Sequence, residues 1–199
     1  MRLGIVSDIH CNALGLARAL ELMGDVDELL CLGDSIYEYR FSNEVARLLR
    51  ERRAQVIVGN HEEYFFGPQG ERARARDGVD PALMAWLAGQ PPRRELFLGG
   101  KRLLMVHSTP WEPRGAYIFP ESALLDRFAE AGADFVLYGH THHQLANRVG
   151  RVMVINPGSA GDARDHRNGG LLSCAVLDTA SEEVTLFDYA DPQRDAAGP

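Results

Sequence analysis

Residues 2–12 read RLGIVSDIHCN, in which the apolar run from Leu3 to Val6 leads directly into the polar block Ser7-Asp8-Ile9-His10. Short runs rich in Val, Ile and Leu are typical of buried strands. Four further polar blocks each follow such a run: Gly33-Asp34, Gly59-Asn60-His61-Glu62, His107 and Gly139-His140-Thr141-His142. Because binding sites in open α/β sheets form outside the carboxyl ends of strands, we expect these distant blocks to meet at one rim.

The remaining pattern divides the chain into two halves of an α/β fold. Strand–helix alternation fills the first half, with helices expected over residues 12–23, 42–53 and 81–88. The second half is richer in hairpins, with two-residue turns at Gly99-Gly100 and Gly150-Arg151 and a final antiparallel pair over 171–177 and 184–189. A further helix is expected over 122–131. Residues 62–80 are less regular.

The length of 199 residues suits one domain with a full core. We expect this domain to span residues 1–190 and residues 191–199, which have no apolar anchor, to form a frayed tail. No apolar stretch approaches the roughly 20 residues of a membrane span. The N-terminus has no basic region followed by an apolar segment, as a secretory signal would. These features predict a cytoplasmic protein without membrane association.

The net charge of −7 argues against stable nucleic-acid binding, which depends on basic surface. It is compatible with a small anionic substrate, because metal ions would supply local positive charge. The run Arg72-Ala-Arg74-Ala-Arg76 is most simply a solvent-exposed segment. The three cysteines form no C-x-x-C pair, and Cys31 and Cys174 lie in apolar runs, so we expect core thiols rather than disulfides.

The polar blocks contain side chains that ligate metals. Asp8 and His10, like His140 and His142, are two residues apart, and extended backbone would place each pair on one face. Asp34 and Asn60 each follow a glycine, which permits a sharp turn and close backbone approach. Imidazole, carboxylate and amide ligands together suit Mn, Fe, Co, Ni or Zn.

The number of ligands predicts two ions rather than one. Seven candidates are too many for a tetrahedral site, but they suit two ions that share a carboxylate: Asp8, His10, Asp34, Asn60, His107, His140 and His142. Two ions about 3.5–4 Å apart can hold both the attacking and the leaving oxygen of a phosphoryl transfer. A single histidine near an apolar run is usually a packed or surface residue. Five of the seven histidines lie in these blocks, however, and this conjunction favours a metal site.

In this order, the motifs D-x-H, G-D, G-N-H-E, H and G-H-T-H resemble those of the calcineurin-like metallophosphoesterase superfamily over roughly residues 1–190. The segments Ser7–Asn12 and Ile155–Ser159 look similar to its small bacterial and archaeal phosphodiesterase branch. The resemblance implies a four-layer α/β/β/α sandwich with two mixed β-sheets and a dimetal site at the carboxyl ends of the strands.

The resemblance also implies roles for individual residues. Asp8, His10 and His142 would hold the first ion, Asn60, His107 and His140 the second, and Asp34 would bridge them. A metal-bridging hydroxide would attack phosphorus in line, and His61 would be the general acid for the leaving group. Two divalent ions are therefore expected as cofactors, with Mn favoured and Fe, Ni, Co or Zn compatible. The expected substrate is a small phosphodiester.

Two departures from the family pattern bear on the substrate. The protein-phosphatase branch has an Asp three residues after the bridging Asp, where this chain has Tyr37, so the carboxylate that would partner His61 is missing at that position. This makes a protein or dinucleoside polyphosphatase less favoured. Relatives often have Pro-Arg near the end of the loop after Ser159, which makes Arg164 a candidate phosphate contact.

Several alternatives remain open at this stage. The enzyme could be a phosphomonoesterase or a protein or dinucleotide phosphatase of the same superfamily, or a nuclease. The chain could also be a non-catalytic interaction module, like the retromer scaffold subunit of similar fold. Intact ligand positions favour an enzyme. Specificity is expected in residues 63–80 and 108–120, where Trp111, Arg114 and Tyr117 could contact a leaving group or simply pack.

Overall fold

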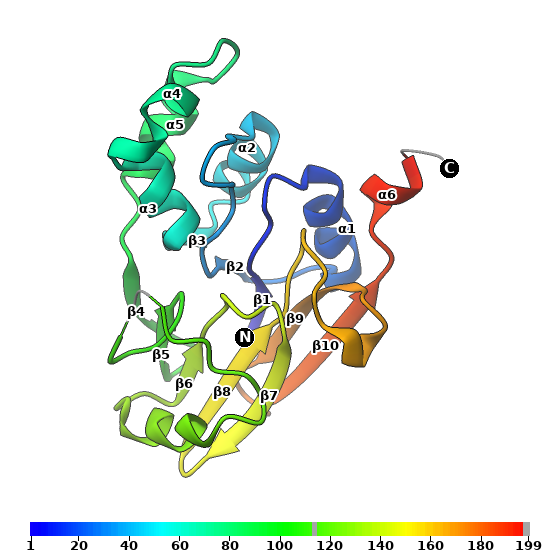
Figure 1. Cartoon of the computed structure of the whole chain (residues 1–199). Coiled ribbons are helices and arrows are strands. Elements are labelled where there is room, and N and C mark those ends of the chain that lie inside the picture. Colours follow the sequence, from blue (N-terminus) through cyan, green and yellow to red (C-terminus); the bar gives the residue numbers. More distant parts are fainter. Residues whose placement is uncertain (113–114, 197–199) are drawn as a thin grey trace.

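The computed structural model describes residues 1–112 and 115–196, and it contains two five-stranded sheets (Figure 1). The first sheet has the order β10-β9-β1-β2-β3 and the second has the order β4-β5-β6-β8-β7. The first comprises β1 (Arg2–Val6), β2 (Glu28–Cys31), β3 (Gln55–Val56), β9 (Leu172–Asp178) and β10 (Glu183–Tyr189). The second comprises β4 (Arg93–Leu98), β5 (Lys101–Val106), β6 (Phe135–Leu137), β7 (Gln144–Val149) and β8 (Val152–Pro157).

Both sheets are mixed, as the family resemblance implies. In the first, β1, β2 and β3 run parallel, and β9 and β10 add antiparallel strands at the other side of β1. In the second, β5, β6 and β8 run parallel, and the hairpins place β4 and β7 antiparallel at the two edges. The strands that precede the polar blocks are therefore the parallel ones, so their carboxyl ends point to the same side.

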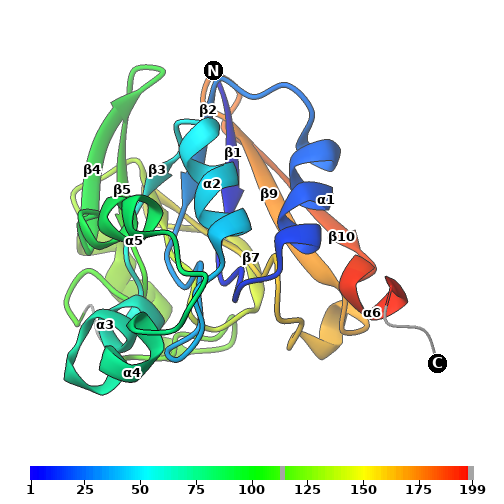
Figure 2. The same ribbon diagram turned by 90° about the horizontal axis from the view of Figure 1, so that it is seen from above.

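Alternation along the strands separates the layers. Leu3 and Ile5 of β1 pack against Leu103 and Met105 of β5 in a cluster between the sheets. Val6 instead faces a second cluster that contains the buried sides of α1 (Ala13–Met23), α2 (Asn43–Glu51) and α5 (Pro81–Ala88), which cover the first sheet (Figure 2). The 3₁₀ helix η2 (Ala123–Glu130) covers the second sheet. These layers confirm the predicted α/β/β/α sandwich.

The helices begin close to their predicted limits because the predicted first residues are caps. The Asn12 side chain accepts a hydrogen bond from the Gly15 amide at 2.8 Å, and Ser42 Oγ accepts one from the Val45 amide at 3.2 Å. Such caps satisfy amide groups that have no partner within the helix. Each helix then begins at the next residue.

The irregular region after Gly59 contains α3 (Asn60–Phe66), the 3₁₀ turn η1 (Pro68–Gly70) and α4 (Glu71–Arg74). Arg74 donates hydrogen bonds to the carbonyl oxygens of Phe65 and, at 2.7 Å, of Gly67. The central arginine of the basic run therefore stabilises the turn between these helices, and only Arg72 and Arg76 are exposed.

The C-terminal segment includes the short helix α6 (Pro192–Ala196), so this part of the expected tail is helical. Earlier in the chain, the 3₁₀ turn η3 (His166–Asn168) precedes β9. Asn12 Nδ2 donates to Asp191 Oδ1 at 2.9 Å, which ties the start of α6 to α1. The domain limit at residue 190 stays a prediction.

Among the described residues, no helix is long and apolar enough to cross a membrane. Cys31 and Cys174 are fully buried free thiols, as predicted.

Candidate metal centre

The polar blocks meet where the parallel strands end. Side-chain ligand atoms lie within 4.8 Å of one another in three groups: Asp8, His10 and His142; His10, Asp34 and His61; and Asp34, His107 and His140. Asn60 joins the third group, with its Oδ1 3.1 Å from His107 Nε2. The structure therefore brings together all seven predicted ligands and His61. Asp34 belongs to two of the groups.

The backbone reason for this convergence differs from the sequence prediction. Extended backbone is wrong for both pairs, because Asp8, His10, His140 and His142 have φ angles of 52°, 48°, 67° and 59°. The backbone of Asp34 also has a left-handed conformation, with a φ angle of 51°. Such conformations typically cost on the order of 1 kcal/mol or more, although Asp and His tolerate them better than most residues. Left-handed turns fold each loop back across the strand ends, which a continued strand could not do.

Glycines allow the loops after β2 and β3 to touch. A Cβ on Gly33, where φ is 92°, would lie 2.7 Å from the Gly59 amide nitrogen. A Cβ on Gly59 would lie 2.2 Å from Asp34 Oδ1. Both positions therefore require glycine for close backbone approach, as the sequence analysis predicted from the residues that precede Asp34 and Asn60.

Glu62, which the sequence analysis did not assign a role, joins these two loops. Its fully buried carboxylate accepts hydrogen bonds from the amides of Asp34 (2.9 Å), Ser35 (2.7 Å), Ile36 (3.2 Å) and Gly59 (2.8 Å), and from Ser35 Oγ (2.6 Å). The Gly59 contact also caps α3, because Glu62 is its third residue. The carboxylate thus holds the loop that carries Asp34 against the helix that carries Asn60 and His61.

The variant Glu62→Gln should lower the free energy of unfolding of the metal-free protein by about 3 kcal/mol. Its amide NH₂ would face backbone donors, and a buried donor left without an acceptor costs about 1–3 kcal/mol in addition to the lost charge-assisted bonds. Urea denaturation measures the change, with the exposed Glu51→Gln as the control. A loss below 1 kcal/mol would show that the loops hold together without this carboxylate.

Two imidazole rings are oriented with one nitrogen towards the centre. His107 Nδ1 lies 2.7 Å from the Leu32 carbonyl oxygen, and His142 Nδ1 lies 2.6 Å from that of Asp162. A carbonyl only accepts, so each Nδ1 carries the proton and donates it. This is the usual arrangement behind metal-binding histidines, because it presents Nε2 to the ion.

The nitrogen and oxygen atoms that face the centre of the cluster offer lone pairs that a bound cation would accept. His107 Nε2 lies 3.1 Å from both Asp34 Oδ2 and Asn60 Oδ1, and His10 Nε2 lies 3.1 Å from His142 Nε2. The buried His140 Nε2 has no hydrogen-bond partner among the described residues. Acceptors and lone pairs that face one another in this way repel unless a proton or a metal lies between them. The residues present therefore fit bound divalent ions.

Charge in the cluster changes the proton affinities. Burial alone would lower the pKa of His107, but the charge of Asp34 and the hydrogen bond to it raise this pKa to about 10. Burial opposes ionisation of Asp34 as well, yet His107 lowers the pKa of that carboxyl. Burial lowers the pKa values of His10 and His140 to about 4, so these rings are neutral near pH 7.

Metal binding near pH 8 should consequently release at least one proton per protein, because ligating imidazoles must be neutral and bound ions also lower the pKa of water. His107 is protonated in the metal-free protein at every pH below about 10, so the release should persist at pH 7–8 and fade as the pH rises through 10. Calorimetric titrations with Mn²⁺ in two buffers of different ionisation enthalpy count the protons. Identical heats in both buffers would contradict a protonated His107.

His61 lies at the edge of the cluster, and its role as a general acid stays a prediction. Its side chain is 20% exposed, and its Nε2 lies 3.8 Å from Asp34 Oδ2. Its backbone amide donates to Asp34 Oδ1 at 2.9 Å, which fixes the start of α3 against the candidate bridging residue.

A carboxylate lies beside His61, although Tyr37, at the position where the protein-phosphatase branch carries one, has none. Glu38 Oε2 lies 2.5 Å from His61 Nδ1, and the Glu38 backbone amide donates to the same nitrogen at 3.3 Å. The backbones of Tyr37 and Arg40 exchange hydrogen bonds of 3.1 and 3.3 Å, and this tight turn directs Glu38 towards His61. The carboxylate beside His61 thus comes from a residue four positions after Asp34 rather than three.

The residues predicted to contact substrate differ in their distance from the cluster. Arg164 forms two hydrogen bonds of 2.9 and 2.6 Å to Asp162, the residue whose carbonyl orients His142. It lies next to the cluster, and its contact with phosphate stays a prediction. Trp111 packs against Phe128, with ring centroids 5.0 Å apart, so it belongs to the core of the second sheet.

Of the other two suggested contacts, Arg114 lies outside the described residues. Tyr117 is stacked on His140 with ring centroids 4.0 Å apart, which places it beside the cluster.

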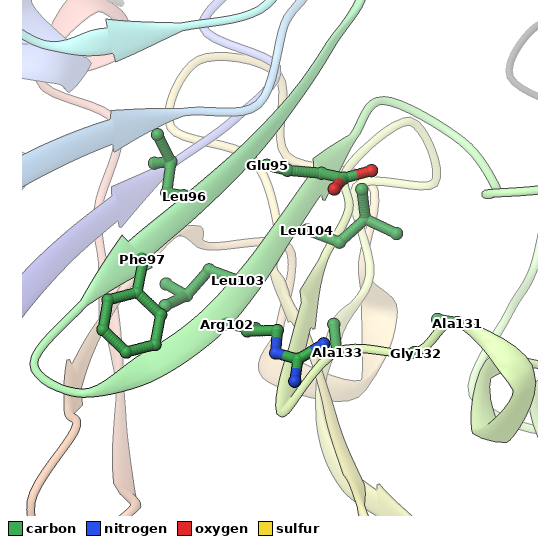
Figure 3. Close-up of a pocket in the computed structure, with 9 residues that line it drawn as sticks. All are labelled: Glu95, Leu96, Phe97, Arg102, Leu103, Leu104, Ala131, Gly132 and Ala133. Carbon is green, nitrogen blue, oxygen red and sulfur yellow. The ribbon is translucent and has the colours of Figure 1, made fainter.

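A separate hollow of about 310 Å³ lies between β4, β5 and the residues that follow η2 (Figure 3). Its lining includes Glu95, Phe97, Arg102 and Gly132, and none of the candidate ligands is among its residues. Glu95 and Arg102 are its charged groups. This hollow therefore has no part in the metal centre.

Comparison with known proteins agrees with this geometry. The family described as the calcineurin-like phosphoesterase superfamily domain matches residues 1–182. The chain belongs to this superfamily. The phosphodiesterase MJ0936 of Methanocaldococcus jannaschii is 23% identical over 188 residues, which cover 92% of this chain and 96% of that protein.

Two solved structures share the fold. A metallophosphoesterase from Sphaerobacter thermophilus aligns with a TM-score of 0.78 at 23% identity, covering 100% of this chain and 95% of the other. Vps29 from Entamoeba histolytica, solved with Zn²⁺, aligns with a TM-score of 0.58 at 20% identity over 95% and 92% of the two chains. At these identities, the two structures show the fold alone.

Proposed function

We propose that this calcineurin-like protein is a metal-dependent phosphodiesterase that hydrolyses a P–O bond of a small diester. The observation that carries the proposal is the set of three adjoining ligand groups, two of which share Asp34 and one of which includes the partly exposed His61. The relative named as a phosphodiesterase over nearly the full length of both chains supports the choice of a diester.

The proposed ligand assignment follows the contacts. Asp8, His10 and His142 would hold one ion, Asn60, His107 and His140 the other, and Asp34 would contact both. Two divalent ions bound there would supply Lewis-acid charge for the phosphate oxygens and would lower the pKa of water at the site. The nitrogen and oxygen ligands suit Mn²⁺, which we propose as the native ion, and accept Fe, Co, Ni or Zn.

The protein itself supplies a proton donor and orientation. His61 would give a proton to the departing alkoxide, and the Glu38 carboxylate would hold the ring through Nδ1 so that Nε2 faces the substrate. The hydrogen bond from the His61 backbone amide to Asp34 Oδ1, at 2.9 Å, keeps this donor next to the candidate bridging ligand. For His61 to protonate it, the leaving oxygen would have to lie on the side of His61 during in-line displacement.

Charge near the centre favours a diester over a monoester. Arg164 beside the cluster is paired with the Asp162 carboxylate at 2.6 Å, so its charge is partly neutralised. A monoester dianion gains more from free cations than a diester monoanion does, so the pairing of Arg164 supports the diester. The net charge of −7 supports a small substrate over stable nucleic-acid binding. We retain the cytoplasm, without membrane association, as the proposed location.

A non-catalytic interaction role is the second candidate, and the fold shared with Vps29 is the observation that favours it. It leaves unexplained why His61 is paired with Glu38 beside a complete ligand set. A surface that only binds another protein needs no proton donor. It also needs no buried nitrogen and oxygen atoms that face one another without a proton or metal between them.

The test is hydrolysis of bis-p-nitrophenyl phosphate and of the monoester p-nitrophenyl phosphate by chelator-stripped protein reconstituted with Mn²⁺. We expect metal-dependent turnover with a clear preference for the diester. A monoester preference would overturn the substrate class while leaving the dimetal chemistry. No turnover of either ester by protein that binds two ions would favour the interaction module.

A further inference from the structure

Two exposed aromatic side chains stand beside the candidate metal centre. Tyr117 is 55% exposed and Phe119 is 39% exposed. The Tyr117 ring lies on the imidazole of His140, with centroids 4.0 Å apart and planes inclined by 28°. Phe119 meets the ring of His143 edge-on at 4.9 Å. An aromatic side chain that stays in water does not gain the free energy of burial. Two such rings beside the candidate metal centre therefore suggest a surface that a ligand covers.

The segment that carries the rings is held in place. Ile118, between them, is fully buried in the cluster under η2, and alternation along the chain turns its two neighbours outward. Ser108 Oγ donates to the Ala116 carbonyl at 2.6 Å, and the Tyr138 hydroxyl donates to the Ile118 carbonyl at 2.9 Å.

The anchors of this segment adjoin the candidate ligands. Ser108 directly follows His107, and Tyr138 stands two residues before His140. The loops that position the ligand atoms therefore also position the aromatic pair.

The geometry of the pair suits a flat ring. The Tyr117 and Phe119 planes are inclined by only 15°, with centroids 6.2 Å apart. Nearly parallel planes offer extended aromatic surface, and stacking of a nucleobase on an aromatic side chain is worth about 1–3 kcal/mol. On the other side of the cluster, Tyr37 is already engaged between His10 (4.6 Å) and the Arg40 guanidinium (4.9 Å).

We propose that Tyr117 and Phe119 form a stacking subsite for the planar base of a nucleotide-type phosphodiester. The inference rests on the proposed function, because the phosphate must be held at His140 for the base to reach the rings. The exposed Phe97 provides a contrast. It is 72% exposed on β4, at the hollow of Figure 3, and no candidate ligand lines that hollow.

Calorimetric titration of the metal-loaded protein tests the subsite without turnover. Adenosine 5′-monophosphate and ribose 5-phosphate carry the same sugar phosphate and differ in the base. We expect the nucleotide to bind about tenfold more tightly, as one stacked base predicts. Equal affinities for the two ligands would overturn the subsite.

Variants localise the effect. Combining Tyr117→Leu with Phe119→Ala should reduce nucleotide affinity to that of ribose 5-phosphate, while the affinity for ribose 5-phosphate stays unchanged. Leucine retains apolar contact with His140 and removes the aromatic face, and metal content is measured for each protein. Phe97→Ala should leave both affinities as in the wild type. A preserved tenfold preference in the double variant would refute the assignment to these rings.

Hydrolysis of methyl p-nitrophenyl phosphate, which has no base, separates this inference from the proposed function. Turnover of this ester together with equal binding of the two sugar phosphates would reject the subsite alone. Base-dependent binding without turnover of the ester would support the subsite and contradict the phosphodiesterase. Absence of both would reject both proposals.

Discussion

The variant Asp34→Asn should lower kcat/KM for bis-p-nitrophenyl phosphate by about three orders of magnitude and remove at least one of the two bound ions. Asp34 is the residue that belongs to both the group around His10 and the group around His107. Lewis-acid stabilisation is worth several kcal/mol, and each 1.4 kcal/mol changes the rate tenfold. An amide keeps the shape of the side chain and loses the charge that two cations would share.

Metal analysis and kinetics on the same preparation test this prediction. Asn can still accept the hydrogen bond that Asp34 Oδ1 receives from the His61 amide, so the start of α3 should remain in place. Asp27→Asn is the matched control, because Asp27 accepts from the Arg2 amide at the far end of β1. Two ions retained with activity within tenfold of the wild type would show that Asp34 does not join the two sites.

Sequence patterns were sufficient for the general location of the site, whereas the four layers were predicted from the family resemblance. Apolar runs predicted the strands, and polar blocks behind them predicted which side chains approach one another, because parallel strands end on the same side of a sheet. The glycines before Asp34 and Asn60 predicted the close contact of two loops, which the structure shows at Gly33 and Gly59.

Interactions that depend on loop geometry could not be predicted in this way. The pairing of Glu38 with His61 arises from a tight turn, and no spacing rule for regular structure describes it. The five amide and hydroxyl donors around Glu62 come from two different loops. Left-handed φ angles at Asp8 and His10 replaced the extended backbone that alternation implied. Each of these depends on tertiary contacts that a local pattern does not contain.

The variant His61→Gln should lower kcat by about 10²–10⁴ for a diester with a poor alkoxide leaving group, which is the usual contribution of a general acid. The decrease in kcat of this variant should be much smaller for a p-nitrophenyl ester, since that leaving group departs as a stabilised anion without a proton. Bound metal should remain at two ions, because the His61 side chain reaches the cluster at its edge, 3.8 Å from Asp34. Kinetics on the two ester types and metal analysis supply the comparison.

Glu38→Gln distinguishes proton donation from a structural role of His61. The carboxylate contacts His61 Nδ1 and is not among the candidate ligands, so its loss should lower kcat for the alkoxide ester by about tenfold and leave KM and metal content unchanged. A residue that only supported the fold would slow both esters equally. If His61→Gln retains the full rate on the alkoxide ester, the proton must come from elsewhere. The pairing of Glu38 with His61 would then orient a ring that binds substrate rather than one that protonates it.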